Sequence, residues 1–168
     1  RAIAEHLYRA VEDAASKGCE RIVDAYAGAG ELTLRLARKA NRVVGIELDR
    51  QAVEEARTAA QRSGLESRIH FHRGRAEELI RKRLPADYVV LDPPRSGCPA
   101  RLIDALCEVP PRRLAYISCH PAALARDLAR FLESKFRLER LVPFDMFPQT
   151  YHLEVLAVLE AKGTCTSE

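Results

Sequence analysis

The stretch Leu114-Ala115-Tyr116-Ile117-Ser118-Cys119-His120-Pro121 decides the fold, because it passes directly from a buried strand into a helix. Pro121 suits the first turn of a helix, where its missing N–H costs nothing. The apolar residues beyond it recur at helical spacing, at Leu124, Leu128, Phe131 and Leu132. Cys119 is therefore expected at a strand's carboxyl end and beside a helix amino terminus, where backbone N–H groups and the helix dipole favour a thiolate. The alternative is an inert, half-buried thiol, the commoner role of a buried cysteine.

The same alternation of strand and helix runs along the whole chain. Hydrophobic patterns predict strands at Arg21–Tyr26, Arg42–Glu47, Arg68–His72, Asp87–Leu91, Leu114–Cys119, Phe136–Pro143 and Leu153–Leu159. They predict helices at Ile3–Ala14, Leu32–Ala37, Arg50–Ser63, Ala76–Arg83, Arg101–Cys107 and after Pro121. Within 32–37 the leucines also alternate as in a strand, but a glycine turn normally leads from a strand into a helix.

This order of elements predicts an α/β fold. Alternating strands and helices form a mostly parallel sheet with helices on both faces, and the last two strands, with no helix between them, add one antiparallel strand. Such a seven-stranded sheet is similar to that of the Rossmann-like class I S-adenosylmethionine methyltransferases. We expect one domain over residues 1–162 and a disordered tail over residues 163–168. Ligands of such sheets bind at the carboxyl ends of the strands.

Composition limits the classes of function. The 168 residues suffice for one domain, and 27 Lys and Arg against 24 Asp and Glu give a net charge of +3, which permits nucleic-acid binding without indicating it. The five cysteines show neither a CxxC motif nor His/Cys ligand spacing, which predicts a reducing compartment and no metal site. There is no signal peptide and no apolar run near 18 residues, so we expect a cytoplasmic protein without a membrane span. Because Arg1 already lies in an expected helix, we expect a fragment of a longer protein.

The segment Asp24–Gly30 (Asp-Ala-Tyr-Ala-Gly-Ala-Gly) predicts a cofactor site. Its two glycines allow a ligand to approach the backbone closely, although an ordinary β–α turn would also use them. Glu47 ends the next strand, where a carboxylate can accept hydrogen bonds from both hydroxyls of a ribose. Thr33 occupies the position at which dinucleotide sites have a small residue, so NAD fits poorly. S-adenosylmethionine fits better, since Asp24 and the glycine turn can supply acceptors for its amino acid part.

Four stretches occur in a characteristic order: Asp24–Ala37, Leu91–Gly97, Tyr116–Pro121 and Phe144–Glu154. Together they resemble the S-adenosylmethionine-dependent RNA uracil-C5 methyltransferases. Each stretch alone is modest, but the ordered set, ending in Phe-Pro-x-Thr-x-His-x-Glu, is highly specific and covers essentially the whole chain.

The resemblance implies roles for particular residues. It makes Cys119 the catalytic nucleophile, Glu154 the general base and Asp92 a residue of the base-binding pocket. It places the cofactor S-adenosyl-L-methionine at Asp24, Tyr26, Gly28, Gly30, Glu47, Ala76 and Asp92. The implied substrate is a uridine of tRNA or rRNA, which must leave its stack or come from a loop to reach such a pocket.

The chain departs from the family pattern at several places. The family usually has Asn after the catalytic cysteine, where this chain has His120. It usually has an acid near the adenine at the position of Arg75, so the backbone N–H of Ala76 or the side chain of Glu77 is expected to make that contact instead. A glutamine-containing motif, an RNA-binding domain and a central insertion precede this region in the family and are not in the sequence. The resemblance therefore implies the catalytic domain alone.

Two other functions remain open at this point. The same fold and cofactor could serve another target, such as cytosine C5 or a small molecule. Cytosine enzymes of this type usually place their nucleophile in the motif after the fourth strand, where Asp92-Pro-Pro-Arg95 has no cysteine and Cys98 is the nearest. Alternatively, the isolated chain binds the cofactor and does nothing else.

Overall fold

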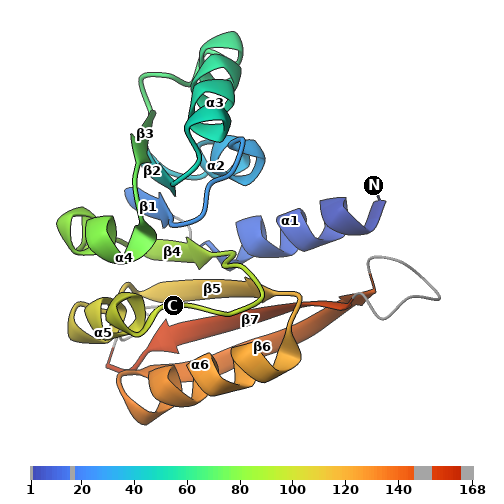
Figure 1. The fold of residues 1–168 in the computed structure, drawn as a ribbon, viewed down its shortest axis with the longest axis vertical. Coiled ribbons are helices and arrows are strands. Elements are labelled where there is room, and N and C mark those ends of the chain that lie inside the picture. Colours follow the sequence, from blue (N-terminus) through green and yellow to red (C-terminus); the bar gives the residue numbers. More distant parts are fainter. Residues whose placement is uncertain (1, 16–17, 146–152, 164–168) are drawn as a thin grey trace.

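The computed structural model describes residues 2–15, 18–145 and 153–163. These residues form one seven-stranded sheet with the strand order β3-β2-β1-β4-β5-β7-β6. Its strands are β1 (Arg21–Asp24), β2 (Arg42–Glu47), β3 (Ile69–Arg73), β4 (Tyr88–Leu91), β5 (Arg113–Ser118), β6 (Phe136–Asp145) and β7 (Leu153–Ala161). Strand β7 pairs antiparallel with both β5 and β6, and all other pairings are parallel (Figure 1). The predicted fold class is confirmed.

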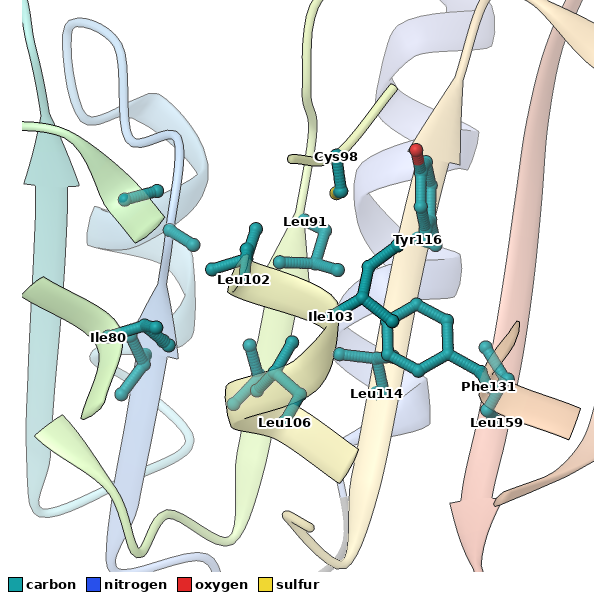
Figure 2. Close-up of a cluster of buried hydrophobic side chains, with 14 of the residues drawn as sticks. Ile80, Leu91, Cys98, Leu102, Ile103, Leu106, Leu114, Tyr116, Phe131 and Leu159 are labelled. Atoms are coloured by element: carbon teal, nitrogen blue, oxygen red, sulfur yellow. The ribbon is translucent and has the colours of Figure 1, made fainter. Parts of the chain in front are cut away.

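Helices cover both faces of the sheet. They are α1 (Ala2–Ala14), α2 (Glu31–Leu36), α3 (Arg50–Arg62), α4 (Ala76–Leu79), the 3₁₀ turn η1 (Ile80–Arg83), α5 (Ala100–Glu108) and α6 (Pro121–Glu133). The first core lies between the sheet and α4, α5 and α6, and the second core lies on the other face, under α1, α2 and α3. Figure 2 shows part of the first core, in which Leu102, Ile103 and Leu106 of α5 lie against Leu91 and Leu114 of the sheet. No helix among the described residues is both long and apolar enough to span a membrane.

The structure decides one ambiguous element and changes the bounds of two others. Residues 31–36 form a helix whose Leu32, Thr33 and Leu36 are buried, so the alternating leucines do not form a strand. The predicted helix 76–83 divides into α4 and the tighter turn η1. Strand β1 ends at Asp24, two residues before the predicted end, because the chain then turns toward the neighbouring strands, where Ala25 N–H bonds to Val90 O and Ala27 N–H bonds to Ile46 O.

Glycine is required where the β1–α2 turn meets α3. Gly30 has φ +87°, a left-handed conformation that a side chain disfavours. A Cβ atom at this residue would lie 2.9 Å from the Cβ of Ala56 and 3.1 Å from the ring of Phe71. The turn is therefore held against α3 and β3 by close packing that only glycine permits.

Asp24, at the end of β1, is buried beneath this turn with 1% of its surface exposed. Its carboxylate accepts a hydrogen bond of 2.7 Å from the hydroxyl of Thr33 in α2. Burial raises the pKa of Asp24 to about 6, and the negative charge of Glu47 adds to that rise, whereas the hydrogen bonds from Thr33 and from the backbone of Tyr26 oppose it. Asp24 thus joins β1 to α2. Burying its carboxyl group costs desolvation free energy, and this cost is larger for the ionised form than for the protonated form.

We predict that this residue makes stability depend on pH. A raised native pKa means that the folded state binds a proton which the unfolded state lacks, so the free energy of unfolding falls as the pH rises through about 6. The measurement is the free energy of unfolding of Asp24→Asn and of wild type in urea at pH 5 and at pH 8. From pH 5 to pH 8, the free energy of unfolding of the variant minus that of wild type should rise by about 1–2 kcal/mol. Thr33→Val should steepen the pH dependence of the otherwise wild-type chain, because it removes a bond that lowers this pKa. If the free energies of unfolding of Asp24→Asn and wild type differ by the same amount at both pH values, Asp24 is not the source of the pH dependence.

Candidate functional site

A cavity of about 380 Å³ opens at the carboxyl ends of the parallel strands, where ligands of such sheets bind. Its volume lies in the range of small-molecule sites. The residues that line it follow β1, β2, β3 and β4: Ala25, Tyr26, Ile46, Glu47, Leu48, Gly74, Arg75, Ala76, Glu77, Pro94, Ser96, Gly97 and Pro99. Three predicted cofactor residues, Tyr26, Glu47 and Ala76, are therefore brought together in one cavity.

Glu47 organises the polar side of this cavity. One carboxylate oxygen accepts the backbone N–H of Gly28 at 2.9 Å, and the other accepts the N–H of Asp49 at 2.8 Å. These bonds hold the carboxylate at the end of β2 and fasten the glycine turn to it. Each carboxylate oxygen has a further lone pair, so Glu47 can still accept the two hydroxyls of a ribose. This donor and acceptor chemistry fits a nucleoside-containing cofactor.

The residues after β3 supply the opposite side of the cavity. The cavity is lined by Arg75, Ala76 and Glu77. Ala76 and Glu77 are therefore available to make the contact that an acid at position 75 would make. Ala76 is the first residue of α4, whose N-cap, Arg75, makes no side-chain cap bond. The Arg75 guanidinium instead lies 3.8 Å from the carboxylate of Glu77.

The other four predicted cofactor residues, Asp24, Gly28, Gly30 and Asp92, are not among the described residues that line the cavity. Gly28 acts through its bond to Glu47, and Gly30 precedes α2 as its N-cap. The buried Asp24 carboxylate lies behind the turn. The structure therefore places Asp24 as a support for this turn, and not at the surface of the cavity.

Cys119 and Glu154 lie next to the end of the β5–β7 ladder. Its last pair is Ser118 with Val155, so Cys119 follows one member of that pair and Glu154 precedes the other. Both side chains are half-buried. Two residues 35 positions apart in the chain thus flank the same strand pair at the carboxyl edge of the sheet.

Asp92 lies at the same edge, directly after β4. Although its side chain reaches solvent, the surrounding protein raises its pKa to about 7, and the charges of Asp24 and Glu154 contribute to that rise. The influence of Glu154 places the two carboxyl groups in one electrostatic environment. Asp92 is followed by the segment from Pro94 to Pro99, which lines the cofactor cavity, so it stands between the cavity and the Cys119–Glu154 pair.

The three predicted catalytic residues hold corresponding positions at the ends of β4, β5 and β7. Each lies two positions from a side chain of the second core, respectively Val90, Ile117 and Leu156. Alternate residues of a strand point to the same face. We infer that Asp92, Cys119 and Glu154 point to this face, where they can surround one flat ring.

His120 replaces the usual asparagine without losing the structural role that an asparagine would have. It is the N-cap of α6, and its Nδ1 accepts the backbone N–H of Ala123 at 3.2 Å. An asparagine side-chain oxygen commonly makes the same bond. The backbone of His120 is also held by the hydroxyl of Ser118, which accepts the His120 N–H at 3.1 Å. Both residues that flank Cys119 are therefore fixed, and so is the backbone from which its thiol projects.

Sequence reasoning missed several residues of the cavity: Leu48, Gly74, Pro94, Ser96, Gly97 and Pro99. Two carried a signal in the sequence, because Gly74 and Gly97 are glycines in segments that follow predicted strands of an α/β fold. Most of the Phe144–Glu154 motif, His152 included, falls at residues 146–152, outside the described residues. The same holds for Cys165 and for the expected tail from residue 164 onward.

Two family models match this chain. The model described as a methyltransferase domain matches residues 22–107, and the model described as tRNA (uracil-5-)-methyltransferase matches residues 80–162. An uncharacterized RNA methyltransferase of Gloeobacter violaceus is 45% identical over 158 residues, which are 94% of this chain and 34% of that protein. Another from Listeria innocua is 39% identical over 163 residues, which are 94% of this chain and 36% of that protein. The chain spans about a third of the length of these relatives.

Solved structures agree with the family models. The tRNA (uracil-54, C5)-methyltransferase of Pyrococcus abyssi, in complex with S-adenosyl-L-homocysteine, superposes with a TM-score of 0.77 and 27% identity, over 92% of this chain and 37% of that one. An rRNA methylase of Streptococcus thermophilus superposes with a TM-score of 0.74 at 17% identity, over 94% and 95% of the two chains, which is evidence for the fold alone. The chain therefore belongs to the S-adenosylmethionine-dependent methyltransferases, and the tRNA (uracil-5-)-methyltransferase model matches its residues 80–162.

Proposed function

We propose that this chain is the catalytic domain of an RNA methyltransferase that transfers a methyl group from S-adenosylmethionine to carbon 5 of uridine in tRNA or rRNA. The observation that carries the proposal is the register of β5 with β7, in which Ser118 pairs with Val155, one residue before Cys119 and one residue after Glu154. The domain comprises residues 1–162. RNA is the proposed partner, and the names of the relatives as RNA methyltransferases support that choice.

The reaction begins at Cys119. Its thiolate adds to carbon 6 of the uracil ring, which forms an S–C6 bond and an enolate that is nucleophilic at carbon 5. Cys119 precedes the N-cap of α6, and the dipole of that helix favours a negative charge there. The bound cofactor supplies the methyl group from its sulfonium.

Two carboxyl groups complete the reaction. Glu154 removes the proton from carbon 5, after which the C6–S bond breaks and Cys119 leaves as a thiolate. Asp92 binds the edge of the uracil. Because its pKa is about 7, a large share of its carboxyl is protonated near neutral pH and can donate a hydrogen bond to the ring oxygen on which charge develops.

Cys98 is a poor candidate for the nucleophile that a cytosine enzyme would need. Its side chain is 6% exposed and belongs to the first core. Burial raises its pKa to about 12, so the thiolate is scarce at neutral pH. This observation favours uracil, with Cys119 as nucleophile, over the cytosine alternative.

We predict a covalent complex with RNA that carries 5-fluorouridine in place of uridine. Fluorine replaces the hydrogen at carbon 5 that the base must remove as a proton. The base cannot break the C–F bond in this way, so the adduct on Cys119 persists after methyl transfer. Denaturing electrophoresis should show a protein–RNA band that requires S-adenosylmethionine and disappears in Cys119→Ala. Cys107→Ala is the matched control, since Cys107 is also half-buried but lies in α5, and its band should equal that of wild type.

A band that survives Cys119→Ala would refute the role of this residue. If the chain binds S-adenosylhomocysteine in calorimetry but forms no adduct with RNA that carries 5-fluorouridine or 5-fluorocytidine, it is a cofactor-binding module without activity in isolation.

We predict a different defect for Glu154→Gln. The amide cannot take the proton from carbon 5, so the variant should methylate ordinary uridine RNA once and remain attached to it. Turnover should fall by roughly 10²–10⁴-fold, while a covalent protein–RNA band accumulates. Glu139→Gln changes a half-exposed acid of β6 that pairs with Arg113, and it should leave turnover within about twofold of wild type. Loss of both turnover and adduct in Glu154→Gln would place this residue before the addition of the thiol, contrary to the proposal.

A further inference from the structure

Asp127 of α6 is a buried carboxylate that the proposed chemistry does not use. Only 1% of its surface is exposed. One oxygen accepts the hydroxyl of Tyr116 and the backbone N–H of Cys98, each at 2.7 Å. The other accepts Nε and Nη2 of Arg126 at 2.9 and 2.8 Å. A helix that lies beside the sheet is thus fastened to the loop that follows β4.

That loop is a wall of the cofactor cavity. Pro94, Ser96, Gly97 and Pro99 line the cavity, and Cys98 lies within the same segment. Figure 2 shows Cys98 and Tyr116 at the same end of the first core. The bond from Cys98 N–H to Asp127 therefore fixes the backbone between two cavity-lining residues.

Arg126 adds a second attachment to the same wall. Its Nη2 donates to the carbonyl oxygen of Ser96 at 2.8 Å while it contacts Asp127. Gly97 lies against this pair with φ +82°, and a Cβ atom there would be 2.5 Å from both an Asp127 oxygen and an Arg126 nitrogen. The loop has no room for a side chain at this point because the carboxylate and guanidinium fill it.

The same helix carries the residues around the nucleophile. His120 caps the amino terminus of α6, and Asp127 lies seven residues, or roughly two turns, further along. Positions seven apart share one helical face. One rigid helix therefore fixes both the backbone beside Cys119 and the loop that borders the cofactor.

We propose that Asp127 is a positioning residue for the cofactor: through Cys98 and Arg126 it holds the 94–99 loop in the shape that closes the cavity. It does not touch the cofactor. Without the charge of this carboxylate, its bonds to Cys98 N–H, Tyr116 O–H and Arg126 weaken, and the loop gains freedom that cofactor binding must then remove. The proposal depends on the cofactor site and not on which base is methylated.

The test is the affinity for S-adenosylhomocysteine, measured by calorimetry. Asp127→Asn should raise Kd by at least tenfold, and Arg126→Gln, which removes the attachment to Ser96 but leaves the buried carboxylate, should raise it by at least threefold. Asp104→Asn is the matched control, because Asp104 of α5 pairs with Arg130 of α6 at 2.6 Å and does not contact the loop. Its Kd should stay within twofold of wild type.

Two further readouts separate positioning from a general loss of structure. Amide hydrogen exchange at Gly97 and Cys98 should quicken in Asp127→Asn while exchange in β5 is unchanged. In a methylation assay with RNA, KM for S-adenosylmethionine should rise and kcat at saturating cofactor should stay within about threefold. If Asp127→Asn does not fold, Arg126→Gln decides. The proposal is overturned if every folded variant among Asp127→Asn and Arg126→Gln has a Kd within twofold of wild type. It is also overturned if kcat falls while KM for S-adenosylmethionine is unchanged.

Discussion

The antiparallel pairing of β7 with β5 is the constraint on which the proposed active site depends. In a purely parallel sheet the start of the last strand lies at the amino edge, far from the carboxyl ends where ligands bind. Because β7 is inserted in reverse between β5 and β6, its first residues reach the carboxyl edge. Glu154 can therefore face Cys119. The hairpin with β6 makes this reversal possible, since two antiparallel strands can be joined without a crossover helix.

Acidic groups at this edge influence one another. Desolvation by the surrounding protein is the main cause of the raised pKa values of Asp24 and Asp92, and each also feels the charge of a neighbouring carboxylate. The two residues nevertheless serve different ends. Asp24 supports the glycine turn through Thr33, whereas Asp92 reaches solvent at the junction between the cofactor cavity and the Cys119–Glu154 pair.

The sequence predicted the fold well, because its evidence is local: strand and helix periods, a glycine turn and a proline in the first turn of α6. Of the cofactor residues that the sequence predicted, Tyr26, Glu47 and Ala76 line one cavity in the structure. The sequence could not show that Asp24 is buried, since the burial of a strand-end acid depends on the turn that folds over it. The register of Cys119 with Glu154 likewise depends on long-range pairing, so only the resemblance to a family joined them.

The role proposed for Asp127 shows another limit of sequence reasoning. This residue lies within the apolar face formed by Leu124, Leu128 and Phe131, and an acid on such a face is a signal of a buried, paired carboxylate. The signal does not reveal the partner, because Cys98 comes from a loop 29 residues earlier in the chain. His120 shows the opposite case: it differs from the usual residue in sequence but makes an equivalent cap.

The most direct test of the account is a crystal structure of the protein bound to S-adenosylhomocysteine and trapped on RNA that contains 5-fluorouridine. The account predicts a covalent bond between Cys119 Sγ and carbon 6 of the ring, with the Glu154 carboxylate beside carbon 5 and Asp92 at the edge of the base. A bond to another residue, or a Glu154 side chain on the far face of the sheet, would contradict it.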